Sequence, residues 1–539
     1  MIDPDYYSRY AYGSTRLGSE HDAEILSHGR GPVAQLGNTV IRLRPEEPCI
    51  VFGGAGSGKG ANIGIYQPVH PDTGSFFILD MSGQYMSTTW HYNLKAGRDA
   101  YAINPEGAGA YPDINHLVNL WGILGINEFL FDNARRIAAM ALRDNDGKGD
   151  NAWVGQGARR WLARLLIGLV LLEERVTPHR LWEMINLIDA DDEFLKAWGR
   201  STEGLPYDVY STMVEIYRKK QGSEKEYGAI MGKIKDDLDW LSSPKVAQSI
   251  SGDEDYLSFL GDPDKKVGIY YVLQGGSGRI MESLTRMVVG ITQLHCIRAN
   301  KGARPLFYLE EAATCGGADF IKQAASECRK YFRSVFVYQS HGQLTHLFGK
   351  SGAQEILDSC GMQLYLGGGI RDPESARRLA EAVGKTTIYI DDPMAQADRA
   401  HRADTVWHEA MWKGNNLMDA ARVYRHELSQ SQQQRQTGRY AIDPAELMRL
   451  KNQILVLTPG LGLPPILADK LLPYWENPAM AGRFGPDPLF PPLDRVTLRR
   501  RFWGKTTRRF IRKPVPKHLA DRPNHINGEI AYVQGYKTW

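Results

Sequence analysis

Short runs of β-branched and aromatic residues recur along most of the chain, and segments with helical spacing separate them. The runs that we predict as strands are Cys49–Phe52, Phe76–Asp80, Tyr101–Ile103, Val267–Leu273, Leu306–Leu309, Val335–Tyr338 and Ile454–Leu457. Strands that are apolar at almost every position are typical of a parallel sheet that helices cover on both faces. The pattern therefore predicts an α/β fold.

The pattern changes between about Glu128 and Ser249. Trp, Leu and Ile recur there at helical spacing, as in WLARLLIGLVLLEE and LWEMINLI, and strand-like alternation is almost absent. We predict an all-α insertion. The chain then divides into residues 1–128 and 250–475 of one α/β domain, residues 129–249 of the insertion and residues 476–539 of a C-terminal extension. Two polar stretches, residues 391–404 and 426–438, are predicted as mobile surface.

Composition adds limits on fold and location. A chain of 539 residues exceeds what one hydrophobic core usually organises, and 42% hydrophobic and 24% charged residues are typical of a soluble globular protein. The five cysteines are widely spaced without a CxxC pair, which indicates neither a disulfide framework nor a zinc site and fits a reducing cytoplasm. No apolar stretch approaches the roughly 20 residues of a membrane span.

The net charge is only +3, but the C-terminal extension is basic. Ten Lys or Arg residues and no Asp or Glu lie between Arg495 and Lys517, interleaved with Phe502, Trp503 and Phe510. Two interpretations stand side by side: a solvated tail on an acidic neighbour, or contact with nucleic acid or anionic lipid.

A glycine-rich loop directly follows the first predicted strand, Cys49–Phe52. Its residues are Gly53, Gly54, Ala55, Gly56, Ser57, Gly58, Lys59 and Gly60. The glycine and lysine spacing is that of a phosphate-binding loop, in which backbone N–H groups surround the phosphates and the lysine reaches the terminal one. A helix is expected to follow and to present its positive N-terminus. Gly60 stands where a Ser or Thr hydroxyl usually binds Mg²⁺, so the ion needs a second acidic motif.

Such a motif closes the predicted strand Leu306–Leu309. Glu310 is the candidate metal ligand, and Glu311 is the candidate base that polarises the attacking water; the alternative is a pair of surface glutamates. Gln339 follows the next strand, where a polar residue senses a terminal phosphate or positions water. A buried amide satisfied by the backbone is the competing interpretation for Gln339.

The order of these motifs resembles that of the type IV secretion coupling proteins of the TraG type. The segments that carry the resemblance are YGSTR (12–16), GSGKG (56–60), LDMSGQY (79–85), INPEG (103–107), NLWGIL (119–124), LEEAA (309–313), VYQSHGQL (337–344), LGGGIRDPESARRLAEAVGKTT (366–387) and LTPGLGLPPILADKLLPYW (457–475). The resemblance covers about residues 10 to 475.

The resemblance implies a RecA-like ATPase core, an all-α substrate-contacting domain, a hexameric ring, and ATP with Mg²⁺ as cofactors. Its implied partners are single-stranded DNA with a relaxase or a protein effector, and the ATPases of the secretion channel. An arginine from a neighbouring subunit commonly completes such sites; Arg371 is our candidate, with Arg329 and Arg333 as competitors. A plain surface arginine is the alternative for each of the three.

The sequence departs from the family pattern at three places. Glu310 replaces an Asp, Ser82 and Gln84 replace a Lys and a Glu, and no paired membrane helices precede YGSTR. We therefore expect slow turnover. The absent helices imply either a small membrane-anchoring partner or a sequence trimmed at that point. We also expect a cytoplasmic location at the inner face of the cell membrane, with an anionic membrane surface as a further contact.

The leading function is an ATPase that delivers a nucleoprotein or an effector protein to a type IV secretion channel. One alternative is a receptor platform that binds ATP with little hydrolysis. The other is a soluble DNA translocase of the FtsK or HerA kind.

Overall fold

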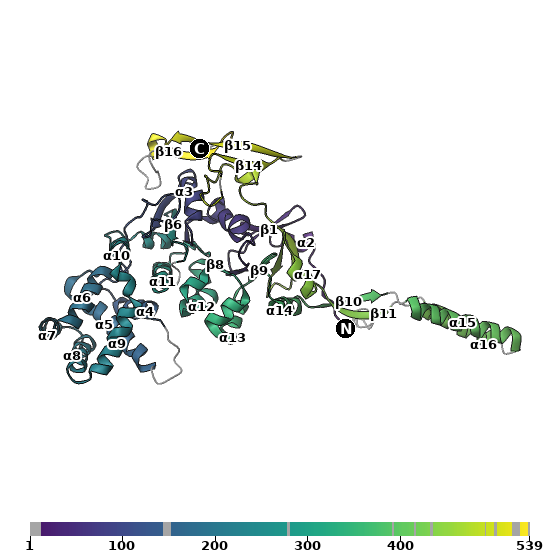
Figure 1. The fold of residues 1–539 in the computed structure, drawn as a ribbon, viewed down its shortest axis with the longest axis horizontal. Coiled ribbons are helices and arrows are strands. Elements are labelled where there is room, and N and C mark those ends of the chain that lie inside the picture. Colours follow the sequence, from purple (N-terminus) through teal and green to yellow (C-terminus); the bar gives the residue numbers. More distant parts are fainter. Residues whose placement is uncertain are drawn as a thin grey trace.

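A single large sheet organises the molecule. The computed structural model describes residues 12–143, 152–276, 281–390, 393–413, 417–431, 435–490, 492–500, 504–519 and 529–536. In these ranges the chain forms an 11-stranded sheet with the strand order β2-β1-β13-β12-β9-β3-β8-β7-β4-β6-β5. Figure 1 shows helices around this sheet, a helical lobe on one side and a long hairpin on the other.

Most of the sheet is parallel, which agrees with the α/β prediction. The parallel strands, in spatial order, are β9 (Met362–Leu366), β3 (Cys49–Phe52), β8 (Arg333–Tyr338), β7 (Leu306–Leu309), β4 (Phe76–Asp80), β6 (Val267–Val272) and β5 (Asp99–Ile103). The antiparallel edge consists of β12 (Gln453–Leu457), β13 (Ile466–Lys470), β1 (Arg30–Leu36) and β2 (Thr39–Leu43). The predicted strand Ile454–Leu457 therefore lies in β12 and runs against its parallel neighbours.

Alternate residues of the central strands belong to two different cores, because successive side chains point to opposite faces of a sheet. Ile50 and Phe52 pack into one core, whereas Cys49 and Val51 pack into the other. The first face is covered by α11 (Glu282–Ala299), α12 (Asp319–Ser326) and α13 (His341–Ser359), and the second by α2 (Glu20–Glu24) and α3 (Gln84–Lys95). Burial on both faces explains why these strands are apolar at every position.

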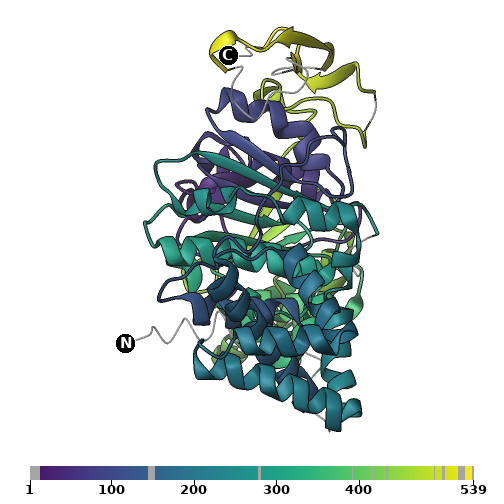
Figure 2. The ribbon, with the colours of Figure 1, turned by 90° about the vertical axis from the view of Figure 1, so that its left-hand side faces the viewer.

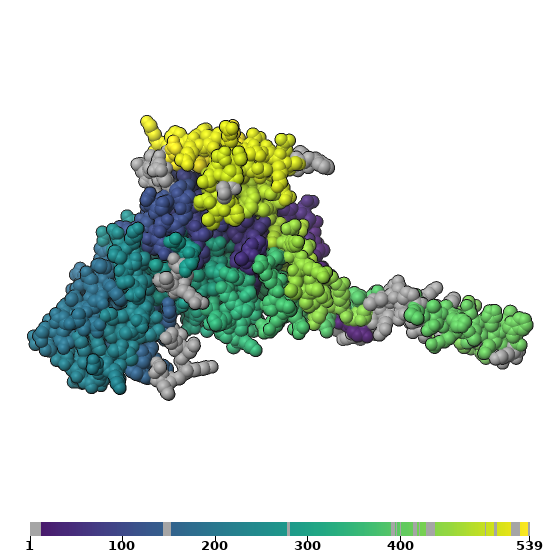
Figure 3. Space-filling view, viewed as in Figure 1, coloured from purple at the N-terminus to yellow at the C-terminus, as the bar shows by residue number. Residues whose placement is uncertain are grey.

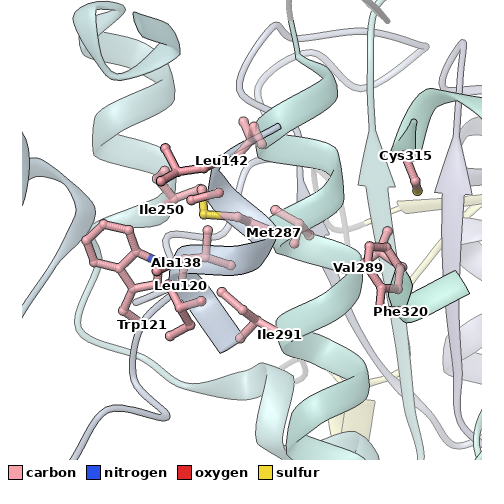
Figure 4. Packing of buried hydrophobic residues seen from close by; sticks show 14 of the residues in the cluster. Leu120, Trp121, Ala138, Leu142, Ile250, Met287, Val289, Ile291, Cys315 and Phe320 are labelled. Atoms are coloured by element: carbon pink, nitrogen blue, oxygen red, sulfur yellow. The ribbon is translucent and has the colours of Figure 1, made fainter. Parts of the chain in front are cut away.

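The helical lobe extends the first core away from the sheet. Its helices are α4 (Leu130–Ala141), α5 (Ala152–Glu173), α6 (Pro178–Ala190), α7 (Asp192–Ser201), α8 (Tyr207–Gly222), α9 (Glu224–Asp237) and α10 (Pro244–Ile250). Helix α11 lies between this lobe and the sheet: Met287 and Ile291 are on the side of Trp121 and Ala138, as Figure 4 shows, whereas Val289 lies near Phe320. The core is continuous across this boundary, so the division into separate domains stays a prediction.

Residues 393–404 and 426–431 are helical and residues 435–438 lie in a strand, so the described part of both stretches that we predicted as mobile surface has regular secondary structure. Helices α15 (Pro393–Lys413) and α16 (Leu417–Ser431) form a hairpin, carried by the two-stranded ribbon of β10 (Lys385–Ile390) and β11 (Arg435–Tyr440). Ala403 and Ala410, seven residues apart, are buried. Their small side chains gave no strong apolar signal in the sequence. Figures 1 and 3 show the hairpin projecting far from the body.

The C-terminal extension is folded. Its strands β14 (Arg495–Arg499), β15 (Lys505–Pro514) and β16 (Glu529–Val533) form an antiparallel sheet, at the end of the molecule opposite the helical lobe (Figure 2). Phe510, one of the aromatic residues interleaved with the basic ones, packs against Phe484. Phe502 and Trp503 lie outside the described residues. Two short helices, α14 (Pro373–Val383) and α17 (Pro444–Arg449), cover the antiparallel part of the main sheet.

Two expectations from composition can be compared with the described residues. No helix in these ranges combines the length and the apolar character that a membrane crossing requires. All five cysteines are buried and form no disulfide, and no described group of His, Cys, Asp and Glu is arranged to hold a metal ion on its own.

Candidate functional site

The glycine-rich loop lies at the carboxyl end of β3, where the sequence placed it. The backbone N–H of Gly53 donates to the carbonyl oxygen of Tyr338 at 3.0 Å and thereby ties the loop to β8. Gly56 and Gly58 have φ angles of +76° and +89°, a region that side-chain-bearing residues rarely adopt. Only glycine fits this curvature without strain.

The helix expected after the loop is short. Residues Lys59–Ile63 form a single π-helical turn, and Gly64–Tyr66 continue as a 3₁₀ turn. Anion binding at this loop therefore depends on the curled backbone and on Lys59 more than on a long helix dipole.

Two loop side chains are suited to a phosphate group. The Lys59 ammonium donates to the carbonyl oxygen of Gly53 at 2.6 Å and so spans the loop. Burial lowers the pKa of Lys59, and the carboxylates of Glu311 and Glu310 oppose that shift. The buried hydroxyl of Ser57 has no hydrogen-bond partner among the described residues. An oxyanion in the loop would satisfy this hydroxyl and would add charge opposite Lys59.

Glu310 and Asp80 form a second, acidic part of the site, at the ends of the neighbouring strands β7 and β4. Burial, and then the Asp80 carboxylate, raises the pKa of Glu310 to about 8. Burial raises the pKa of Asp80 to about 6, although backbone N–H groups of Met86 and Ser82 donate to it. A divalent cation would relieve the repulsion between two such carboxylates, and oxygen ligands are what Mg²⁺ prefers.

Glu311 is held by two amide side chains. Gln339 Nε2 donates to one of its carboxylate oxygens at 3.1 Å, and Gln343 Nε2 donates to the other at 2.8 Å. The side-chain oxygen of Gln343 also accepts from the Gln339 backbone N–H at 2.9 Å. Gln339 is exposed, so the alternative of a buried, backbone-satisfied amide is wrong. Sequence reasoning missed Gln343, which lies in the first turn of α13.

The structure separates the three candidate arginines. Arg371 donates to the carbonyl oxygen of Ala55 in its own loop at 3.0 Å, so it stands beside the site of the same chain. Arg333 is buried at the amino end of β8, where it donates to the carbonyl oxygens of Arg304 and Thr73. That arginine cannot reach a neighbouring subunit. Arg329 is exposed.

A cavity of about 1230 Å³ opens beside the loop. Gly54 and Ala55 form part of its wall, and α13 and α14 supply much of the rest. The rings of Phe52 and Tyr365 stack inside it with their centroids 5.1 Å apart. The cavity leaves room beside the loop for a ligand much larger than a phosphate group.

The predicted site residues therefore converge at one edge of the sheet, whereas Arg333 does not join them. Residues 53–60, Glu310, Glu311 and Gln339 approach from β3, β7 and β8, which are adjacent in the order β3-β8-β7. Their chemical roles, and the role of Arg371, stay predictions.

Comparisons with known proteins agree on one family. Residues 23–406 match the family described as Type IV secretory system Conjugative DNA transfer. The type IV secretion system-coupling protein VirD4 of Bartonella henselae is 25% identical over 191 residues, which cover 35% of this chain and 29% of that protein. VirD4 of Bartonella quintana is 25% identical over 253 residues, covering 46% and 39%. The chain thus spans well under half the length of these curated relatives.

Solved structures of the bacterial conjugative coupling protein TrwB share the fold. An unbound form has a TM-score of 0.57 at 16% identity and covers 85% of this chain and 93% of TrwB. TrwB in complex with ADP and Mg²⁺ has a TM-score of 0.56 at 16% identity, covering 85% and 94%. TrwB has also been solved with a non-hydrolysable ATP analogue. The likeness confirms the predicted α/β fold, a RecA-like core with added helices.

Proposed function

Since the chain belongs to the Type IV secretory system Conjugative DNA transfer family, we propose that it is an ATP hydrolase that delivers DNA with a relaxase, or an effector protein, to a type IV secretion channel. ATP and Mg²⁺ are the proposed cofactors. The observation that carries the proposal is the convergence of Lys59, Glu310 and Glu311 at the carboxyl ends of adjacent strands. TrwB, which shares the fold, has been solved with ADP and Mg²⁺.

The proposed roles follow from the chemistry of each group. Bound Mg²⁺ supplies charge neutralisation for the phosphates. The loop N–H groups and the Lys59 ammonium would bind and orient the terminal phosphates, and Glu310 would hold the metal. Glu311, fixed at both oxygens by Gln339 and Gln343, accepts a proton from the attacking water. Because two amides hold the carboxylate, little reorientation is needed before the proton moves.

ATP turnover by the full chain, with and without single-stranded DNA, tests this function. We expect steady phosphate release that DNA stimulates and that Lys59→Ala abolishes. A folded protein that binds ATP but releases no phosphate under any of these conditions would leave the receptor platform as the function. The departures at Glu310, Ser82 and Gln84 favour that alternative. The soluble translocase is set aside because of the family match.

The assembly and the partners are further parts of the proposal. A homohexamer is the proposed assembly. Arg371 stays the proposed arginine for a neighbouring subunit, and in the single chain it donates to Ala55 in its own loop. Relaxase or effector, channel ATPases and a small membrane-anchoring protein are the proposed partners. A cytoplasmic position at the inner face of the cell membrane follows from these contacts. Cross-linking and pull-down from the native cell test them.

The C-terminal sheet offers a surface for anionic partners. Arg495 pairs across the strands with Arg509, Thr497 with Thr507, and Arg499 with Lys505. Like charges directly opposite each other destabilise a sheet. Glu476 neutralises the last pair through ion pairs of 2.7 and 2.9 Å, whereas Arg495 has only a long ion pair of 4.0 Å with Asp494. A phosphate backbone of DNA fits this face, with an anionic membrane surface as the second source of phosphate.

A further inference from the structure

Gly60 leaves a space in the site that oxygen atoms of other segments border. A Cβ atom at Gly60 would lie 3.3 Å from Gln84 Oε1, 3.6 Å from the Tyr85 hydroxyl and 3.8 Å from Glu310 Oε1. A hydroxymethyl group at this position would therefore point among these three oxygens. The space that a loop hydroxyl usually fills is thus bordered here by an amide oxygen from α3 and a carboxylate oxygen from the end of β7.

The orientation of the Gln84 amide is fixed by Asp487. Gln84 is the first residue of α3 and is only 7% exposed, and its Nε2 donates to Asp487 Oδ2 at 2.7 Å. The Tyr474 hydroxyl donates to the same oxygen, and the Leu489 backbone N–H donates to Oδ1 at 2.9 Å. A carboxylate in this network only accepts hydrogen bonds, so the NH₂ group of Gln84 must face it. The carbonyl oxygen of Gln84 is left facing Gly60.

We propose that Gln84 Oε1 supplies the neutral oxygen ligand for Mg²⁺ that Gly60 cannot supply, and that Asp487 is the positioning residue that holds this oxygen in place. The inference rests on the proposed binding of Mg²⁺ and ATP. Mg²⁺ demands oxygen ligands in a nearly fixed geometry, so a buried amide locked by a second residue is well suited to the role. An amide oxygen is uncharged like the hydroxyl it replaces, and it adds no charge beside Glu310 and Asp80.

One consequence is that the C-terminal extension takes part in the nucleotide site. Asp487 lies in the segment that precedes β14, about 400 residues from Gln84 in sequence. Tyr474, its other buried partner, belongs to the segment after β13. Loss of this segment would free the Gln84 amide to rotate, and the metal site would lose a fixed ligand.

The test measures metal affinity rather than turnover. A fluorescent ATP analogue is titrated onto the full chain in EDTA and over a series of free Mg²⁺ concentrations, and Mn²⁺ bound with the analogue is followed by electron paramagnetic resonance. For Gln84→Ala we expect nucleotide affinity in EDTA to be unchanged and half-saturating Mg²⁺ to rise at least about tenfold, the effect typical of lost metal-site contacts. Asp487→Asn should also raise the half-saturating Mg²⁺ concentration, and it should change the spectrum of the bound Mn²⁺.

A second-site change makes the test specific. Gln84→Ala empties the space next to Gly60, so Gly60→Ser in that background has room for its side chain, whereas in the wild type it meets Gln84 Oε1 at a tight 3.3 Å. We expect Gly60→Ser with Gln84→Ala to recover most of the roughly tenfold loss of Mg²⁺ affinity. The matched control is Gln221→Ala, which removes an exposed amide that donates to Asp192 in the helical lobe, away from the site, and should leave Mg²⁺ affinity unchanged.

Several outcomes would overturn the inference. The inference is wrong if Gln84→Ala has the same Mg²⁺ dependence as the wild type. It is also wrong if Gln84→Ala binds Mg²⁺ equally well with and without the Gly60→Ser change. If Gln84→Ala does not fold, Gln84→Met keeps the length of the side chain without its oxygen and is judged by the same criteria. A wild-type protein that binds no nucleotide at all would instead contradict the proposed function, and the two failures are therefore distinguishable.

Discussion

Replacement of Glu311 by Gln is the sharpest test of the proposed hydrolysis. The change removes the negative charge that would accept a proton, while the side chain keeps its shape. Its new NH₂ group then faces the NH₂ group of Gln339 or Gln343, since each now donates to a different carboxylate oxygen of Glu311. One hydrogen bond to a charged acceptor is lost, and such a bond contributes about 1.5–3 kcal/mol to holding the side chain in place.

The expected loss in rate follows from the chemistry of a general base. A positioned base contributes about 10²- to 10⁴-fold, or about 2.7 kcal/mol of barrier for the smaller figure. We therefore expect phosphate release by Glu311→Gln to fall at least about tenfold, with affinity for an ATP analogue within about twofold of wild type, because a base acts on the reaction more than on binding.

The assay combines phosphate release at saturating ATP with a separate binding titration. Glu355→Gln is the matched control, because Glu355 is an exposed glutamate of the same helix as Gln343 and should show wild-type turnover. Wild-type turnover in a folded Glu311→Gln protein would refute the base assignment. Equal loss of binding and turnover would instead identify Glu311 as a residue that shapes the pocket.

The remaining predictions address the loop, the metal, pH and the C-terminal sheet. Lys59→Ala should abolish binding of the ATP analogue with an unchanged circular dichroism spectrum, because the charge opposite the terminal phosphates is lost; unchanged affinity would contradict the loop assignment. Glu310→Gln should weaken the Mg²⁺ dependence of nucleotide binding, which a Mg²⁺ titration measures. Because the pKa of Glu310 is raised from 4.5 to about 8, its contribution to stability is present below pH 4.5 and is lost as the pH rises to about 8. Without Mg²⁺, the thermal midpoint of the wild type should therefore fall over this window more than that of Glu310→Gln; parallel curves would refute the shift. Deletion of residues 495–539 should flatten the salt dependence of binding to single-stranded DNA and to anionic vesicles, since each phosphate contact makes affinity fall more steeply with salt. If the dependence of affinity on salt is unchanged for both, the sheet would be left as a docking surface for protein.

The local pattern of the sequence was sufficient for the central strands and for the loop. The bounds of β3, β4 and β7 agree with the predicted runs Cys49–Phe52, Phe76–Asp80 and Leu306–Leu309, because burial on both faces demands an apolar residue at each position. The need for glycine at positions 56 and 58 could likewise be predicted from the sequence, since residues with side chains rarely adopt the backbone angles found there. Glu310 and Glu311 could be found because an acidic pair at the end of such a strand has no packing role there.

The partners of these residues were decided by the tertiary structure. Gln343 holds Glu311 only because α13 begins beside the end of β7, and Asp487 meets Gln84 only because the C-terminal segment folds back over α3. The sequence did not predict the hairpin of α15 and α16, because its buried positions include small residues such as Ala403 and Ala410, which add little to a periodic pattern of hydrophobicity. A sequence pattern records which face of an element is buried, since burial depends on hydrophobicity at each position. It does not record which other element lies against that face, because many surfaces of similar polarity satisfy the same pattern, and only the packed chain selects one.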